Sequence, residues 1–425
     1  MNREIAIIGL GYVGLSLATA LSKTYKVYGY DISESRIQEL KKGFDKNNLV
    51  NEAELQDSPV FFTSNTHEIR TANFFIVTVP TPAFFYELPN LEPVINATKA
   101  VGNILKKGDI VVYESTVYPG TTEEVCQPLL EEMSGLRCGT DFNIGYSPER
   151  ISPHDPHYNL KNIIKVISAQ NQETLKQIED VYKNCCDTLY PVSSIKTGEA
   201  VKILENTQRD INIACMNEFA QIMHGLDLNV HEILQAAKTK WSFVPFKPGF
   251  VGGHCIAVDP LYLAFKAKRI GVPHDLILTA RKVNDGMPYF VISQLVQALI
   301  KYDIPVKHCP VGVLGITYKE NAADIRSSLA LKFIKELKLA GFQCQVHDPF
   351  ADRDYVEKKY DIHLVDYDEV NTLSAAIVVV GHDYYRQKGL QSLVTKCQRP
   401  AVIMDIPNLF AEEKLDEPGV FYWGL

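Results

Sequence analysis

The sequence predicts an α/β protein in which two doubly wound, parallel-sheet domains are joined by a central domain of long helices. Short β-rich runs alternate with helical stretches near both ends of the chain, and residues 198–224 form one long helical stretch without proline or internal glycine. Strands with helical connections at this spacing are typical of parallel sheets covered by helices. With 425 residues, the chain is also too long for one ordinary core.

The first α/β domain is expected over residues 1–195. Its predicted strands are Ile5–Gly9, Lys26–Tyr30, Phe74–Val79, Ile110–Glu114 and Asn143–Tyr146. The predicted helices between them are Leu15–Leu21, Glu34–Lys42, Leu91–Leu105 and Thr121–Met133. Two further β-rich runs, Ile163–Ser168 and Thr188–Tyr190, are expected to extend the sheet.

The central domain is expected over residues 196–305, with helices at 198–224, 230–238 and 276–302. We expect the last helix to be interrupted near Gly286 and Pro288, because both residues weaken helices. Long helices between two α/β segments often form the core of a dimer, so a homodimer is predicted.

The second α/β domain is expected over residues 306–425, where the alternation of strands and helices resumes. Its predicted elements are a strand at Val311–Gly315, a helix at Ser327–Ala340, and strands at Gln343–His347, Ala375–Val380 and Ala401–Asp405. This domain is smaller than the first.

The composition restricts the possible partners and location. The chain is 46% hydrophobic and 22% charged with a net charge of −8, which disfavours nucleic acid and anionic membranes as partners. No apolar run approaches the roughly 20 residues of a membrane span, and the first strand leaves no room for a signal peptide, so a cytoplasmic protein is expected. Nine cysteines without metal-ligand spacing predict reduced thiols, with Cys255 as a functional exception, and no metal.

A dinucleotide-binding fingerprint, Gly9-Leu-Gly-Tyr-Val-Gly14, lies between the first strand and the first helix. Gly9 serves the turn, Gly11 lets the backbone approach a pyrophosphate, and Gly14 allows close packing of helix and strand. Asp31 ends the second strand, where a carboxylate would bind the ribose hydroxyls of NAD and repel the 2′-phosphate of NADP. Arg36, one turn into the next helix, weakens this preference, because an arginine near this position can bind the 2′-phosphate of NADP. The motif therefore predicts a Rossmann-like domain that binds NAD.

Other candidate residues follow strands of the same sheet, at the edge where ligands bind. Thr81 lies in a Val-Pro-Thr-Pro segment that serves equally well as an ordinary turn, whereas the Thr116 hydroxyl could orient a water or the nicotinamide ribose. Glu149, in a Ser-Pro-Glu-Arg segment, could act as a general base if burial raises its pKa. Alternatively, Glu149 only helps to start a helix.

On the long central helix, Lys202 and Asn206 are four residues apart and therefore share one face. Because their neighbours are mostly apolar, this face is expected to be buried. An ammonium group and an amide there could stabilise a developing oxyanion. Alternatively, Lys202 forms an internal salt bridge with Glu199 or Glu205.

Cys255 occupies a glycine-rich segment, Lys247-Pro-Gly-Phe-Val-Gly-Gly-His-Cys-Ile-Ala-Val-Asp-Pro260. Glycines let a ligand approach the backbone closely, so the thiol is well placed to act as a nucleophile. His254 is expected to shape the loop or contact substrate, because neighbouring side chains usually point apart. Asp259 follows four residues after the thiol.

The segment from Gly315 to Ser328 leads out of the first strand of the second α/β domain. It places Lys319 and Arg326 at the ligand-binding edge of that sheet, where they could neutralise a diphosphate. A solvated loop with an Asp324–Arg326 pair is an equally good interpretation of the spacing.

Together these motifs resemble the UDP-glucose/GDP-mannose dehydrogenase family over essentially the full chain. The segment from Gly252 to Pro260 is most similar to the branch that oxidises UDP-N-acetylhexosamines, UDP-N-acetylglucosamine above all. Residues 206–214, 216–218 and 239–241 are similar to the same branch. Pro153 stands where relatives acting on UDP-glucose keep a second glutamate, which argues against glucose as the sugar.

The resemblance implies two successive NAD-linked oxidations that convert the C6 hydroxyl of the sugar to a carboxylate. Cys255 corresponds to the nucleophile, which forms a thiohemiacetal and then a thioester; Lys202 and Asn206 correspond to the residues that stabilise the oxyanion. Asp259 and Thr116 match positions that hold the catalytic water, and Glu149 matches the hydrolytic base.

The resemblance also implies the binding residues. Those implied for the cofactor are Gly9, Gly11, Tyr12, Val13, Gly14, Asp31, Arg36, Thr81, Thr116 and Arg326. Those implied for the substrate are Glu149, Arg150, Lys202, Asn206, Gly252, Tyr318 and Lys319. The central helices are expected to form the dimer, and a cell-surface polysaccharide is the natural destination of the product.

Three questions stay open from the sequence. The sugar could be the gluco, galacto or manno epimer of the UDP-N-acetylhexosamine, or UDP-glucose. A two-electron hydroxyacid dehydrogenase of similar architecture would use Lys202 and Asn206 without a thiol. A catalytically silent NAD-binding scaffold would need none of these residues.

Overall fold

A computed structural model describes residues 3–47, 50–82, 88–151, 157–253, 256–413 and 415–425. By its internal contacts the chain forms two compact units. The first comprises residues 1–206 and 261–273, and the second comprises residues 207–260 and 274–425. The long helix α7 (Ile195–Gly225) belongs to both units, since the division falls within it.

The first unit contains an eight-stranded sheet in the order β3-β2-β1-β4-β5-β6-β7-β8. Its strands are β1 (Glu4–Ile8), β2 (Lys26–Tyr30), β3 (Phe61–Thr63), β4 (Phe74–Val77), β5 (Ile110–Tyr113), β6 (Asn143–Tyr146), β7 (Ile164–Ala169) and β8 (Thr188–Pro191). The first six strands are parallel and follow the order of a dinucleotide-binding fold. The two predicted extensions join as β7 and β8, and β7 runs antiparallel to β6.

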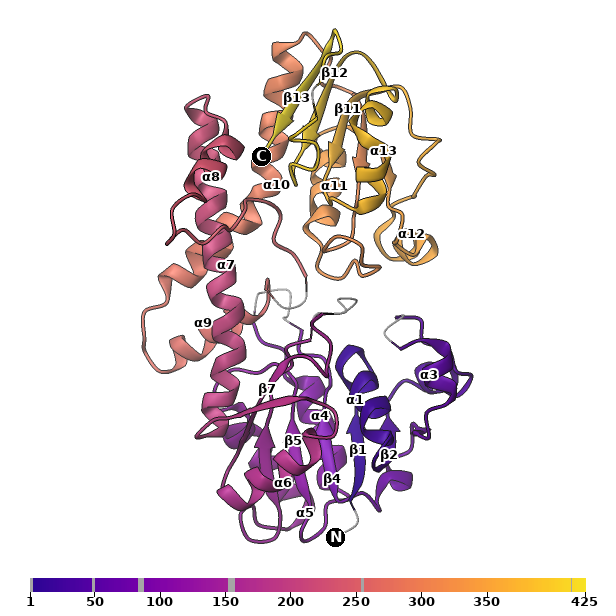
Figure 1. The fold of residues 1–425 in the computed structure, drawn as a ribbon, viewed down its shortest axis with the longest axis vertical. Coiled ribbons are helices and arrows are strands. Elements are labelled where there is room, and N and C mark those ends of the chain that lie inside the picture. Colours follow the sequence, from indigo (N-terminus) through magenta and orange to yellow (C-terminus); the bar gives the residue numbers. More distant parts are fainter. Residues whose placement is uncertain (1–2, 48–49, 83–87, 152–156, 254–255, 414) are drawn as a thin grey trace. The chain divides into compact units, whose positions relative to one another are not determined.

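Helices cover both faces of this sheet (Figure 1). They are α1 (Tyr12–Ser22), α2 (Glu34–Lys41), α3 (Glu52–Gln56), α4 (Glu92–Gly102), α5 (Gln127–Ser134) and α6 (Gln172–Tyr182), with the short turns η1 (Thr66–Ile69) and η2 (Thr122–Cys126). Alternate residues of β1 serve opposite cores: Ile5 and Ile7 join one apolar cluster, and Ala6 and Ile8 join the other. A strand buried on both faces reads as a continuous apolar run, which is how β1 appears in the sequence.

Three further helices are α8 (Val230–Ala237), α9 (Asp259–Arg269) and α10 (Asp275–Lys301). The predicted interruption of the last helix is wrong, because α10 continues through Gly286 and Pro288. Pro288 is buried on the same helix as Met287, Val291 and Leu295, and packing of these apolar side chains outweighs the one backbone hydrogen bond that proline cannot make.

The second unit contains a five-stranded parallel sheet in the order β10-β9-β11-β12-β13. Its strands are β9 (Pro310–Leu314), β10 (Gln343–His347), β11 (Leu373–Val378), β12 (Cys397–Asp405) and β13 (Val420–Gly424). Its helices are α11 (Leu329–Leu339), α12 (Arg353–Tyr360) and α13 (Asp383–Val394). In sequence order the arrangement is 2-1-3-4-5, the other common doubly wound topology.

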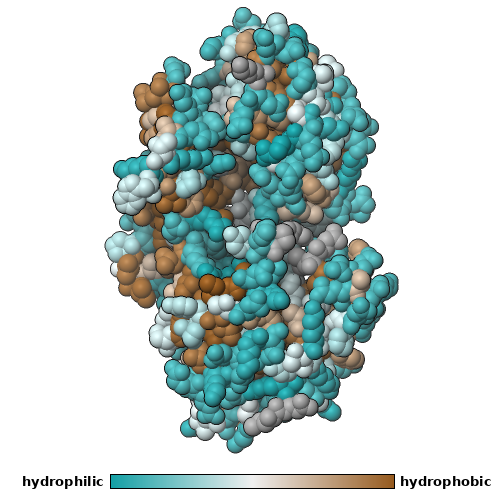
Figure 2. All heavy atoms as spheres, in the orientation of Figure 1, coloured by the Kyte–Doolittle hydropathy of each residue, from teal (hydrophilic) through white to brown (hydrophobic). Residues whose placement is uncertain are grey.

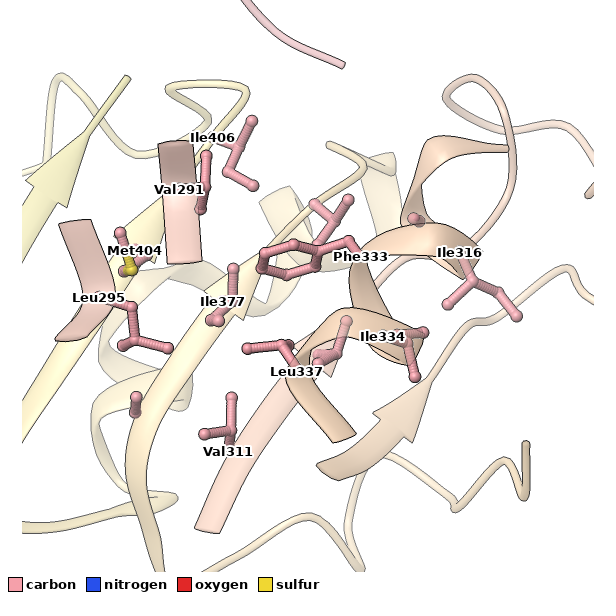
Figure 3. Packing of buried hydrophobic residues seen from close by; sticks show 14 of the residues in the cluster. Val291, Leu295, Val311, Ile316, Phe333, Ile334, Leu337, Ile377, Met404 and Ile406 are labelled. Carbon is pink, nitrogen blue, oxygen red and sulfur yellow. The ribbon is translucent and has the colours of Figure 1, made fainter. Parts of the chain in front are cut away.

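The main core of this unit lies between helices and one face of the sheet (Figure 3). Phe333 and Leu337 of α11 and Leu295 of α10 pack with Val311 and Ile377 of the central strands. All five side chains are completely buried. The loops that follow β9 and β11 therefore start from a rigid base.

The elements predicted from the sequence do not include β3, α3, α6, α9, α12, α13, β13 or the turn η1. Most are short or strongly charged, so they lack a clear apolar periodicity. No helix among the described residues is long and apolar enough to cross a membrane.

Candidate functional site

The glycine fingerprint forms a tight turn between β1 and α1. Gly9 has a φ of +99°, which strains other residues, and a side chain on Gly14 would place its Cβ 1.8 Å from the Gly9 carbonyl oxygen. Gly11 caps α1 without a side-chain hydrogen bond, and no atom lies within 4 Å of where its Cβ would be. The start of α1 thus has no side-chain cap and has room beside Gly11, as a phosphate-binding cradle requires.

Asp31 and Arg36 occupy different positions beside this turn. The half-exposed Asp31 carboxylate accepts hydrogen bonds from the backbone N–H groups of Leu10 (2.8 Å) and Ser33 (2.9 Å). Arg36 is buried, and its guanidinium pairs with Glu39 at 2.6 Å and Asp45 at 2.8 Å. Because two carboxylates already neutralise Arg36, its charge offers little to a 2′-phosphate, and the site favours NAD over NADP.

The loops that follow β4 and β5 are joined to each other at the ligand-binding edge. The Ser115 hydroxyl donates to the Val79 carbonyl at 2.7 Å, and the Tyr146 hydroxyl donates to the Ser115 carbonyl at 3.2 Å. Thr116, the next residue, and Thr81 are both half-buried. The remaining predicted cofactor residues, Tyr12 and Val13, begin α1.

Glu149 and Lys202 lie together although they are distant in sequence. The Lys202 ammonium is 3.6 Å from a carboxylate oxygen of Glu149, and the two side chains are only 9% and 15% exposed. Glu149 also accepts a hydrogen bond from the Ile151 backbone N–H. Asn206, one helical turn beyond Lys202, is buried as predicted. A cation and a carboxylate with limited water access are suited to proton transfer and charge stabilisation.

The two carboxylates suggested as alternative partners of Lys202 have other contacts. Glu205 instead pairs with Arg150 at 2.8 Å, and the Arg150 guanidinium also donates to the Ile164 carbonyl at 2.8 Å. Glu199 accepts hydrogen bonds from the Gly120 and Thr122 backbone N–H groups. Burial raises the pKa of Glu199 to about 7.

A buried charged group not anticipated from the sequence lies behind the loop that follows β5. The Lys165 ammonium is 2.6 Å from Glu114, and the side chains are 1% and 0% exposed. The Tyr182 hydroxyl donates to the other Glu114 oxygen, and its ring lies 5.2 Å from the ammonium. Burial raises the pKa of Glu114, and the Lys165 charge opposes that rise. The sequence signal for this pair is Lys165 itself, because a lysine inside the apolar run Ile163–Ile167 would be buried in the sheet and would need a carboxylate partner.

In the second unit, the glycine-rich segment packs against the loop that follows β9. The Gly253 backbone N–H donates to the Ser327 carbonyl at 2.9 Å. A Cβ on Gly252 would lie 2.7 Å from that same oxygen, and a Cβ on Gly253 would lie 2.8 Å from the Tyr318 ring. Larger residues would therefore separate the two segments.

The start of the glycine-rich segment is held by the Asn217 side chain of α7. Its amide nitrogen donates to the Gly249 carbonyl at 3.0 Å, and its amide oxygen accepts from the Gly249 N–H at 2.7 Å. Asn217 also donates to Asn284, which donates in turn to Asp210, and Arg281 pairs with Asp210 at 2.5 Å. These four side chains are buried, so the polar network fixes one end of the loop.

The remaining predicted residues lie at the start of α9 and in the loop between β9 and α11. Asp259 is buried as the first residue of α9. Lys319 lies 6.0 Å from the centre of the Tyr318 ring. Arg326 is half-exposed and forms two-point hydrogen bonds with Asp324, the pairing that the alternative interpretation anticipated.

Cys255, His254 and Pro153 lie outside the described residues. The eight other cysteines carry free thiols, in line with the prediction. Within the described ranges no cluster of three His, Cys, Asp or Glu side chains could hold a metal ion.

Three family models match consecutive parts of the chain. All describe the UDP-glucose/GDP-mannose dehydrogenase family: its NAD binding domain matches residues 3–186, its central domain residues 196–286, and its UDP binding domain residues 312–412. Together they span most of the sequence.

Individual proteins are similar over nearly their whole length. The chain is 44% identical to a UDP-N-acetyl-D-glucosamine 6-dehydrogenase of Salmonella typhi and 42% identical to one of Pseudomonas aeruginosa, covering 97% of this chain and 98% of each relative. It is 31% identical to a UDP-N-acetyl-D-mannosamine dehydrogenase of Pyrococcus horikoshii, with 96% of each covered. A solved structure of the UDP-D-ManNAc dehydrogenase from that organism superposes with a TM-score of 0.89, at 29% identity and 99% coverage of both chains.

Proposed function

This chain belongs to the UDP-glucose/GDP-mannose dehydrogenase family, and we propose that it oxidises the C6 hydroxyl of UDP-N-acetylglucosamine to a carboxylate. It is an NAD-dependent oxidoreductase that acts on a nucleotide sugar. The observation that carries the choice of sugar is the higher identity to the N-acetylglucosamine enzymes, 44% and 42%, than to the N-acetylmannosamine enzyme, 31%.

The residues of the first sheet fit NAD. Gly11 and the uncapped start of α1 suit the pyrophosphate, and the Asp31 carboxylate suits the ribose hydroxyls. When bound there, NAD supplies the hydride-accepting capacity for each two-electron oxidation.

Cys255 is proposed as the nucleophile that retains the substrate between the two oxidations. The first oxidation removes two electrons and two protons from the C6 alcohol and leaves an aldehyde. The Cys255 sulfur adds to the aldehyde carbon, and the oxygen takes up a proton to give a thiohemiacetal. Loss of a second hydride and a proton gives a thioester, which water cleaves to the acid and the free thiol. Overall, one UDP-sugar, two NAD and one water give one UDP-sugar acid and two NADH, with release of protons.

Lys202 and Asn206 are proposed to stabilise negative charge on the C6 oxygen. The Lys202 ammonium and the Glu149 carboxylate are 3.6 Å apart, so both charged groups are available to the same reacting oxygen. Glu149 is proposed as the base that activates the hydrolytic water, which Thr116 and Asp259 are proposed to hold. Arg150, Gly252, Tyr318 and Lys319 are proposed as substrate-binding residues, and Arg326 as a cofactor residue.

The test is the stoichiometry of NADH against a panel of UDP-sugars. Two NADH per sugar and a carboxylate product are expected with UDP-N-acetylglucosamine; preference for the galacto or manno epimer, or for UDP-glucose, would correct the substrate. Cys255→Ser should form no acid. Undiminished acid from that variant would refute the covalent route, and one NADH per substrate would favour a hydroxyacid dehydrogenase.

A homodimer through the central helices is a second proposal. Ile222, Leu226 and Leu228, at the end of α7 and the turn into α8, are 51%, 59% and 47% exposed. Figure 2 shows apolar side chains gathered at that end of the helix. Trp241 is 95% exposed. Exposed apolar groups at this density suit contact with a second copy. Light scattering should give a molar mass of twice the chain mass for the wild type, and Leu226→Asp should shift the measured mass toward that of a single chain.

A further inference from the structure

The second sheet has its topological switch point between β9 and β11, because β10 pairs with β9 on the opposite side. Ligands of doubly wound sheets bind beyond the carboxyl ends of the strands at such a point. The loop that follows β9 carries Tyr318 and Lys319, the proposed contacts to the nucleotide sugar. What fixes the conformation of this loop therefore affects binding.

One buried carboxylate, Asp348, connects this loop to the one that follows β10. Its Oδ2 accepts the backbone N–H groups of Ile316 at 2.6 Å and Thr317 at 3.2 Å. Its Oδ1 accepts those of Phe350 at 2.8 Å and Ala351 at 2.9 Å. Four donors to one ionised group fix the direction in which both loops leave the sheet.

His382, in the loop that follows β11, adds the third connection. The Asn321 backbone N–H donates to His382 Nδ1 at 2.9 Å, so the proton of the neutral ring is assigned to Nε2. Nε2 lies 3.2 Å from Asp348 Oδ2 and 3.2 Å from the Thr317 hydroxyl, which donates to the Lys319 carbonyl at 2.9 Å. The imidazole is completely buried and bridges both ends of the segment 316–321.

The corresponding acid of the first sheet is used differently. Asp31 also follows the second strand and also accepts the N–H of the residue after the first glycine, Leu10. It is half-exposed, however, whereas Asp348 is 4% exposed and faces His382. In a dinucleotide-binding domain the acid at this position binds the ribose, whereas in the second domain Asp348 binds the backbone of two loops of its own sheet.

We propose that Asp348 and His382 are positioning residues for the nucleotide sugar, which hold segment 316–321 in the conformation that lets Tyr318 and Lys319 bind the uridine diphosphate group. The proposal deepens the proposed function and rests on it. Because both side chains are buried, they would act on the ligand through segment 316–321.

The test is the affinity of the full-length protein for UDP, measured by calorimetry together with steady-state kinetics. His382→Leu removes the three polar contacts of the ring and should raise the Kd of UDP and the KM of the UDP-sugar at least tenfold, with kcat and the KM of NAD changed less than twofold. His382→Gln, which can keep the donor to Asp348, should recover part of this loss. The matched control is His363→Leu, since His363 is 73% exposed in the same domain.

A milder variant covers the case in which His382→Leu does not fold. Thr317→Val removes the hydroxyl link to Lys319 and should raise the Kd of UDP about threefold. Unchanged UDP affinity in a folded His382→Leu or Thr317→Val protein would overturn the positioning role and leave the proposed function intact. Failure of the wild type to bind UDP would overturn both.

Discussion

Replacement of Lys165 by methionine should destabilise the first unit strongly. Lys165 and Glu114 are 1% and 0% exposed, and their charged atoms are 2.6 Å apart. Removing one partner leaves the other charge buried, which typically costs about 3–5 kcal/mol. For a unit of this size each kcal/mol lowers the melting temperature by about 2–4 °C, so a loss of about 6–20 °C is expected. Methionine conserves most of the side-chain volume, so the loss reports charge rather than packing.

The double variant Lys165→Met/Glu114→Gln should recover most of this loss, because no buried charge is left unpaired. Without Lys165 the pKa of Glu114, already raised by burial, should rise further. The deficit of the single variant relative to wild type should therefore shrink as the pH falls from 8 to 5 and Glu114 takes up a proton. Lys107→Met is the control, since Lys107 is 77% exposed in its pair with Asp141. Differential scanning calorimetry measures all four proteins. A melting temperature of Lys165→Met within 2 °C of wild type would refute the reasoning.

Three more predictions follow from local geometry. Gly14→Ala should reduce the affinity for NAD, measured by calorimetry, at least tenfold, because the new Cβ would lie 1.8 Å from the Gly9 carbonyl oxygen of the turn. Gly286→Ala, where a Cβ meets open space, should leave the NAD affinity unchanged. Equal losses of affinity in the two variants would contradict the prediction. Burial raises the pKa of Glu199 from 4.5 to about 7, so its contribution to stability is present below about 4.5 and is lost as the pH rises to about 7. The melting temperature of Glu199→Gln should therefore depend less on pH between about 4.5 and 7 than that of the wild type. The same pH dependence in both proteins would contradict this prediction. Asn217→Ala should lower kcat at least tenfold in the NADH assay, because it releases the glycine-rich segment. The control is Asn212→Ala on the same helix, whose side-chain amide donates to the Gln208 carbonyl of that helix. Retained activity in Asn217→Ala would refute the role of Asn217 as the anchor of the segment.

Local patterns were sufficient for much of the fold and for the residue types of the site. The β-rich runs bounded by turn residues predicted β2, β6 and β10 to the residue. Periodicity failed where packing outweighs propensity: α10 continues through Pro288 because its apolar face is buried. It also failed for α12, whose charged sequence carries little apolar signal.

Partners distant in sequence were beyond the reach of local patterns. The alternative interpretation of Lys202 was a salt bridge with Glu199 or Glu205 on its own helix, but a carboxylate oxygen of Glu149, which follows a strand of the sheet, lies 3.6 Å from its ammonium group. Likewise nothing in the spacing joins Asp348 to His382, because a parallel sheet brings the ends of separate strands to one edge.

The sequence by itself determined the cofactor, because a glycine turn followed by an acid is typical of NAD binding. A thiol among glycines predicts a covalent intermediate, which stays a prediction. Such motifs are local, and their residue types are required by the backbone conformation or the reaction. Only the tertiary structure decided which charges are paired. Glu114 is buried against Lys165, 51 residues away in the chain, and Asp348 faces His382, 34 residues away. Local patterns cannot predict pairings between segments so far apart.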